Sequence, residues 1–71
     1  MAHIQILGSH ESHDGMYIKE IDKKNAKLTF TKKVEEAYYR SSGFYAESER
    51  DFVKYHFKKE YPFVAYARVI D

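Results

Sequence analysis

The sequence predicts an α+β fold, a small two-layer sandwich in which one main helix covers an antiparallel sheet. Three stretches of alternating apolar and polar residues come first, a helical pattern follows, and an apolar stretch closes the chain. Alternation with a period of two is typical of half-buried strands, and strands in a row followed by a helix favour this class. The expected order is β-β-β-short α-α-β, in a single domain spanning residues 1–71.

The first predicted strand covers residues 3–7, where Ile4 and Ile6 share one face. A polar loop bounded by two glycines follows, over residues 8–15. The second predicted strand covers residues 16–21. Simple alternation there places Met16 and Ile18 on one face and the following residues on the other: Tyr17, Lys19 and Ile21.

The third predicted strand covers residues 26–31, with Ala26, Leu28 and Phe30 turned inward. Residues 22–25, DKKN, separate it from the second strand. Asp and Asn suit a turn because their side chains hydrogen-bond to nearby backbone groups. The second and third strands should therefore form a hairpin.

The segment from 32 to 40 predicts one or two helical turns, because Val34, Ala37 and Tyr38 have spacings of three and four. Ser41, Ser42 and Gly43 should end this helix. Residues 44–46 are expected to be extended or turn-like.

The main helix is predicted over Glu47 to Glu60. Its apolar stripe consists of Phe52, Val53, His56 and Phe57. Ser48 suits the N-cap, with Asp51 three residues later, and Pro62 stops the helix.

The last predicted strand covers residues 63–70 and is apolar in both of its alternating sets. Such a strand is usually central, or its outer face is also covered. A homodimer, in which the strand lies at the sheet edge and pairs with its copy, is the other interpretation.

Composition excludes several classes of protein. The formal net charge of +1 argues against a strong field of one sign, and the lack of cysteine excludes disulfides. No apolar run has the length needed to span a membrane. The N-terminus lacks the pattern of a signal peptide. These features predict a cytoplasmic protein with no membrane contact.

No motif points to catalysis, so we expect neither an enzyme nor a cofactor. The loop containing His10 and His13 has metal-ligating residue types, but its spacing differs from that of known zinc motifs and favours a solvated loop. His56 borders the apolar helical face without a sequence-defined partner. The expected metal site is therefore none.

Tyrosine usage favours a protein partner. Seven tyrosines in 71 residues exceed what so small a core can bury with satisfied hydroxyls. Tyr and Arg are enriched at interface hot spots. We predict partner contacts at Tyr38, Tyr39, Arg40 and Tyr45. The alternative interpretation places Tyr38 and Phe44 in the core, with the other aromatics covering its edge.

The alternative function is nucleic-acid binding. Lysines surround the predicted hairpin, and a tyrosine shares its outward face. Aromatic and basic side chains on a sheet can stack and hold single strands. The candidate residues are Tyr17, Lys19, Lys23, Lys24 and Lys27. An edge strand also uses lysines to avoid pairing with other chains.

The run FTKKVEEAYY at 30–39, followed by ESERDF at 47–52 and a closing strand, resembles small accessory proteins of phages and mobile elements in Gram-positive bacteria. The similarity covers roughly residues 16–70. The resemblance implies a non-enzymatic protein that binds and modulates a host or defence protein, for example in an anti-CRISPR-like role. It identifies no site residue.

Overall fold

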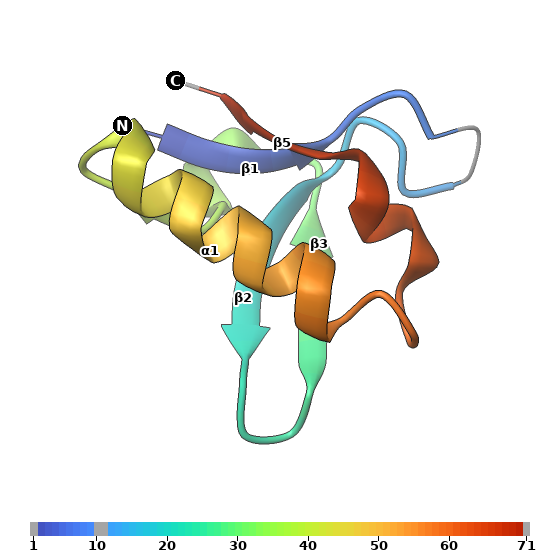
Figure 1. Ribbon diagram of the computed structural model, residues 1–71. Helices are drawn as coiled ribbons and strands as arrows, with labels where there is room; N and C mark the ends of the chain where they lie inside the picture. The colour runs from blue at the N-terminus through green and yellow to red at the C-terminus, as the bar shows by residue number, and fades with distance from the viewer. Residues whose placement is uncertain (1, 10–11, 71) are drawn as a thin grey trace.

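The computed structural model describes residues 2–9 and 12–70 and confirms the predicted class, with one main helix packed on an antiparallel five-stranded sheet (Figure 1). The elements in chain order are β1 (Ala2–Ile6), β2 (Tyr17–Asp22), β3 (Lys27–Thr31), the 3-10 turn η1 (Val34–Glu36), β4 (Tyr39–Arg40), α1 (Gly43–His56), the 3-10 helix η2 (Pro62–Tyr66) and β5 (Ala67–Ile70).

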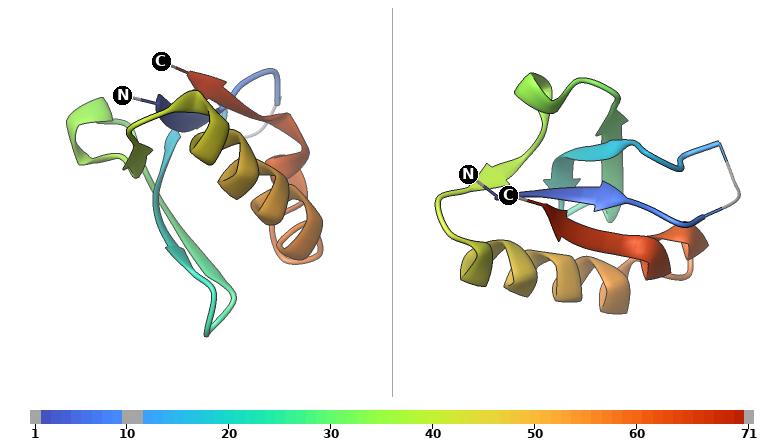
Figure 2. Two further views of the ribbon diagram at one scale, coloured as in Figure 1. Left: turned by 60° about the vertical axis from the view of Figure 1, so that its left-hand side comes forward. Right: turned by 90° about the horizontal axis from the view of Figure 1, so that it is seen from above.

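β1 is the central strand of the sheet. β5 pairs with it along residues 3–6, while β2 and β4 share its other side. Gln5 lies opposite Tyr17 of β2, and His3 lies opposite Tyr39 of β4. β3 continues the sheet beyond β2. In the left view of Figure 2 the β2–β3 hairpin descends on one side of β1 and α1 on the other.

A bulge at Lys19 changes which residues of β2 reach the core. Ile18 lies opposite Phe30, but Glu20 lies opposite Thr29, so Lys19 is an extra residue. One extra residue resets the alternation of side chains along a strand. Ile21 therefore returns to the core face beside Ile18, and the prediction that it shared a face with Tyr17 and Lys19 was wrong.

The core lies between α1 and the sheet, as the inward positions of the strands predict. Its fully or nearly fully buried members come from both layers: Ile4, Ile6, Ile18, Leu28, Val53, Phe57, Phe63, Val64 and Ala67. Ala26 was expected inward but is exposed in the hairpin loop.

α1 begins four residues earlier than the pattern predicts. Ser42 is its N-cap and accepts a hydrogen bond from the Tyr45 N–H at 3.5 Å. Residues 44–46, expected to be extended, form its first turn. Ala46 is fully buried, two turns before Val53, and extends the apolar stripe toward the N-terminus.

The segment after α1 is a strand only in its second half. Phe63 and Val64 are both buried because a 3-10 turn directs consecutive residues into the core, which explains the two-sided apolar pattern. β5 pairs with β1 alone among the described strands, so it is an edge strand and not a central one. The homodimer through this strand remains a prediction.

Candidate functional site

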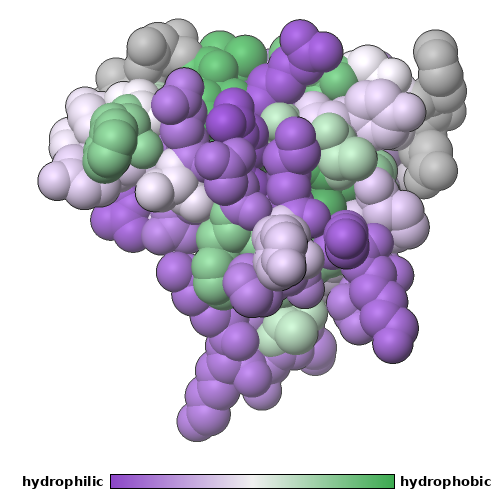
Figure 3. Space-filling model, in the orientation of Figure 1, coloured by the Kyte–Doolittle hydropathy of each residue, from purple (hydrophilic) through white to green (hydrophobic). Residues whose placement is uncertain are grey.

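Three aromatic side chains are largely exposed at the end of the molecule where β4 turns into α1. Tyr39 is 56 % exposed, Phe44 75 % and Tyr45 59 %. Tyr39 belongs to β4, while Phe44 and Tyr45 occupy the first turn of α1 and meet edge to face at 5.6 Å. Figure 3 shows apolar side chains at this end of an otherwise largely hydrophilic front face. We call Tyr39, Arg40, Phe44 and Tyr45 the aromatic end.

Arg40 is held in place by two neighbours. Its Nε donates a hydrogen bond to the Tyr38 hydroxyl at 2.6 Å, and a terminal guanidinium nitrogen donates to Glu49 at 3.3 Å. The hydrogen bond with Tyr38 and the nearby Glu49 carboxylate raise the pKa of Arg40, so the guanidinium stays charged. The predicted contact residue Tyr38 is itself half-buried against the core, where it positions Arg40.

Tyr39 continues a row of rings on the sheet face that α1 does not cover. The register places Tyr39 opposite His3, and Tyr17 opposite Gln5, so all four side chains share that face. The His3 ring lies 6.3 Å from the ring of Tyr39 and 6.1 Å from that of Tyr17. The half-buried Tyr17 thus belongs with this row and lies away from the hairpin tip.

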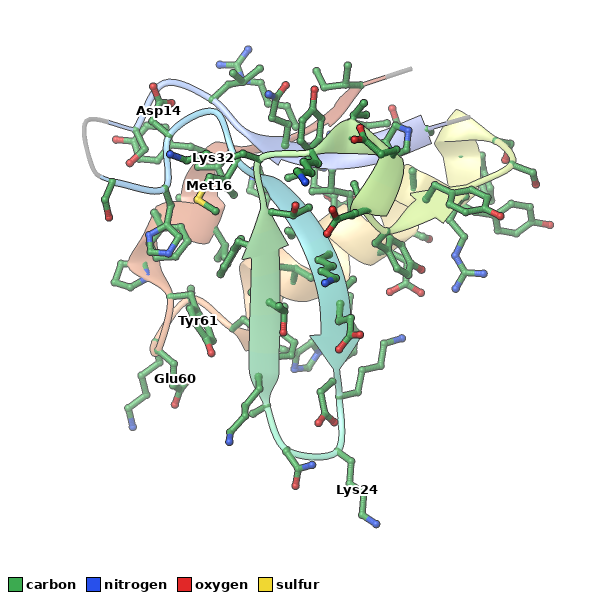
Figure 4. All side chains as sticks on the ribbon, turned by 180° about the vertical axis from the view of Figure 1, so that it is seen from behind. Asp14, Met16, Lys24, Lys32, Glu60 and Tyr61 are labelled. Atoms are coloured by element: carbon green, nitrogen blue, oxygen red, sulfur yellow. The ribbon has the colours of Figure 1, made fainter. Side chains whose placement is uncertain are left out.

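Three of the predicted lysines, Lys19, Lys23 and Lys24, line one groove with the half-buried Tyr38, but the exposed aromatics Tyr39, Phe44 and Tyr45 do not line it. Lys19 pairs with Glu36 at 3.7 Å, and Lys23 pairs with Glu49 at 3.4 Å. Within residues 2–9 and 12–70, Lys24, Lys27 and Lys32 form no ion pair. In Figure 4, Lys24 stands at the hairpin tip and Lys32 at the opposite end of β3.

The histidine loop contributes to packing. The His13 ring stacks on Phe63 at 4.2 Å and meets the edge of Phe30 at 4.9 Å. Asp14 accepts a hydrogen bond from the Gly8 N–H at 2.9 Å. His10 and Glu11 lie outside the described residues. In the part of the chain that is described, no three His, Asp or Glu side chains are grouped so as to hold a metal ion.

Phe44 is the surface residue that the sequence-based site omitted. The alternative interpretation of the sequence placed Phe44 in the core, whereas it is exposed in the structure. The signal that could have placed it is Ser42 before Gly43, because an N-cap there puts Phe44 in the first turn and seven residues before the exposed Asp51.

No family model, curated protein or solved structure matches this chain. For the ranges 2–9 and 12–70, none of the helices combines the length and apolarity that a membrane crossing requires.

Proposed function

We propose that this protein is a small non-enzymatic interaction module that binds a partner protein through the aromatic end. The observation that carries the proposal is the exposure of the Phe44–Tyr45 ring pair and of Tyr39 at the end of the molecule that also contains the positioned Arg40. Tyr, Phe and Arg are enriched at protein interfaces, whereas single-domain proteins rarely leave such groups together in solvent without a use for them.

The aromatic end is preorganised for binding. Arg40 is fixed by Tyr38 and Glu49, and the Phe44–Tyr45 pair stands on a capped helical turn. Groups that are already ordered lose less conformational entropy when a partner binds. The resemblance to accessory proteins of phages and mobile elements extends the proposal to an inhibitor or modulator of a host or defence protein.

The test is affinity capture from a bacterial lysate with the tagged protein, with and without nuclease, read by mass spectrometry. We expect one stoichiometric protein partner that survives nuclease. Tyr39→Ala with Tyr45→Ala should abolish its capture, because hot-spot residues each contribute about 2 kcal/mol or more.

The matched control is Tyr55→Ala with Tyr66→Ala, since both tyrosines are exposed and lie outside the aromatic end. This variant should keep the partner. Capture that persists without Tyr39 and Tyr45, or that is lost equally in the control, would contradict the proposal. Capture that nuclease removes would favour the nucleic-acid alternative.

A further inference from the structure

Among the strands that the structure describes, none lies beside the edge of β2 beyond the bulge. β2 pairs with β1 only at Tyr17, and the Tyr38 N–H donates to the Ile18 carbonyl at 2.9 Å as β4 takes the place next to β1. From Lys19 onward, no described strand pairs with the side of β2 that faces away from β3. Figure 1 shows no strand alongside this flank in the lower half of the hairpin, where the Lys23 side chain reaches Glu49 and Phe52 of α1.

Ile21 directs its backbone groups to that edge. Leu28, its partner on β3, donates its N–H outward to the Tyr61 hydroxyl at 3.2 Å. Leu28 and Ile21 are therefore a non-hydrogen-bonded pair of the ladder, and the N–H and C=O of both point away from each other. Ile21 thus offers one donor and one acceptor, the pair that an added strand uses.

An open groove of about 630 Å³ follows this edge. Its wall on the far side is Tyr38, which connects it through Arg40 and Glu49 to the aromatic end. The residues lining the groove are Lys19, Glu20, Ile21, Asp22, Lys23, Lys24 and Tyr38.

Two of the other sheet edges, those of β3 and β5, are less available. The Tyr61 hydroxyl occupies the outward N–H of Leu28 on β3, and Figure 4 shows Tyr61 beside that strand. On β5 the N–H of Ala67 donates to Val64 within η2. Of these three edges, the β2 edge is the one that combines an outward donor–acceptor pair with a groove.

A second copy of the chain does not suit this edge. Antiparallel self-pairing centred on Ile21 places Lys19 opposite Lys23 of the second copy, and Glu20 opposite its Asp22. Like charges directly opposite one another destabilise a strand pair. The charges along this edge therefore select a different partner.

We propose that the β2 edge binds an extended segment of a partner protein as an added strand, and that the charges of β2 select it. The segment has an apolar residue opposite Ile21, flanked by two basic residues and then by two acidic ones. The basic residues lie opposite Glu20 and Asp22. The acidic ones follow on either side, next to Lys19 in the bulge and Lys23 at the start of the hairpin loop. The pattern reads the same in both directions. Main-chain hydrogen bonds hold such a segment, and side-chain pairs select it.

The proposed function is the basis of this inference, because the inference describes how a protein partner docks. Lys19 can exchange its partner for one in the segment, since an exposed ion pair such as Lys19–Glu36 is weak. Lys23 contacts Glu49 and the Phe52 ring on α1, so it must leave both to pair with the segment.

The test uses the whole, isotope-labelled protein and two synthetic peptides, TTEKVKETT and TTKEVEKTT, followed by backbone amide spectra. The two peptides have the same composition and zero net charge, and differ only in the order of their charges. We expect the first to shift the amides of Ile21 and Lys23 at a concentration about tenfold lower than the second.

Two variants separate charge recognition from general attraction. In the variant Lys19→Glu with Lys23→Glu, the ratio of the affinities for the two peptides should fall close to one. Lys32→Glu should leave this ratio unchanged, because Lys32 lies at the opposite end of β3 (Figure 4) and does not line the groove. The same spectra report whether each variant is folded. If a variant does not fold, the comparison of the two peptides on the unaltered protein still tests the inference.

Equal binding of both peptides, shifts centred on another strand, or no shift at millimolar peptide would overturn the inference. Tyr39→Ala with Tyr45→Ala should still bind the first peptide. A failed peptide titration alongside lysate capture that depends on Tyr39 and Tyr45 would refute the docking mode and leave the proposed function standing.

Discussion

At the scale of single residues, the hairpin loop contains a strained position. Ala26 has φ of +53°, the left-handed region that side chains other than glycine rarely adopt. The loop is held from its other end, where the Asp22 carboxylate accepts hydrogen bonds from the Asn25 backbone and side chain, at 3.1 and 2.9 Å. These bonds lower the pKa of Asp22. They also fix the turn, so Ala26 must adopt the strained conformation.

Replacing Ala26 by glycine should stabilise the protein. Glycine adopts positive φ without steric cost, so the substitution removes the strain at this position. The relief of strain exceeds the extra conformational entropy that glycine loses on folding, and we expect about 0.5–1 kcal/mol of added stability. Urea unfolding followed by circular dichroism measures it. The control is Ala65→Gly, which has no positive φ and should lose stability. A lower midpoint for Ala26→Gly would contradict the strain.

At the scale of elements, the start of α1 determines the surface of the molecule. Beginning at Gly43, the helix places Phe44 and Tyr45 in its first turn and buries Ala46. A start at Ser48 would have left residues 44–46 in a connecting segment. The N-cap at Ser42 is therefore part of what presents the aromatic end.

The two serines give a direct test of where α1 begins. Ser42→Ala removes the acceptor for the Tyr45 N–H and should cost about 1 kcal/mol of stability. Ser48→Ala lies inside the helix at an exposed position and should be neutral or stabilising by a few tenths of a kcal/mol, since alanine has the higher helix propensity. Urea denaturation measures the free energy of unfolding of both variants. A larger loss for Ser48→Ala than for Ser42→Ala would place the cap at Ser48.

At the scale of the whole molecule, the exposed aromatics of the aromatic end and the lysines without ion pairs occupy different regions. The aromatic end lies where β4 meets α1, while Lys24 stands at the hairpin tip and Lys32 at the far end of β3. Single-strand binding needs stacking rings and cations along one groove. This separation favours a protein partner over nucleic acid.

The separation predicts weak binding to nucleic acid. Within residues 2–9 and 12–70, three lysines on or beside the hairpin strands are outside ion pairs. They can neutralise few phosphates, so affinity for nucleic acid should be negligible near physiological salt, about 0.15 M. An electrophoretic assay with a labelled single-stranded oligonucleotide should show no shift at micromolar protein. A salt-sensitive shift that disappears in Lys24→Glu with Lys27→Glu would instead support the nucleic-acid function.

Some of this structure could be predicted because its signals are local. The class, the hairpin and the amphipathic stretch around Val53 and Phe57 follow from periodicity within ten to fifteen residues. The candidate contacts Tyr39 and Tyr45 were predicted from composition, and both are exposed in the structure. The bulge at Lys19 could not be predicted in this way, because it depends on the register with β3.

The sequence by itself determined the fold class, because alternating and helical patterns require one face of each element to be buried. Tertiary structure decided where those elements begin and which side chains stay outside. Ala46 belongs to α1 and is fully buried, Phe63 and Val64 leave the strand because both fit the core, and β4 takes the place of β2 beside β1. Each of these outcomes depends on residues far away in the chain, whose contacts outweigh weak local preferences.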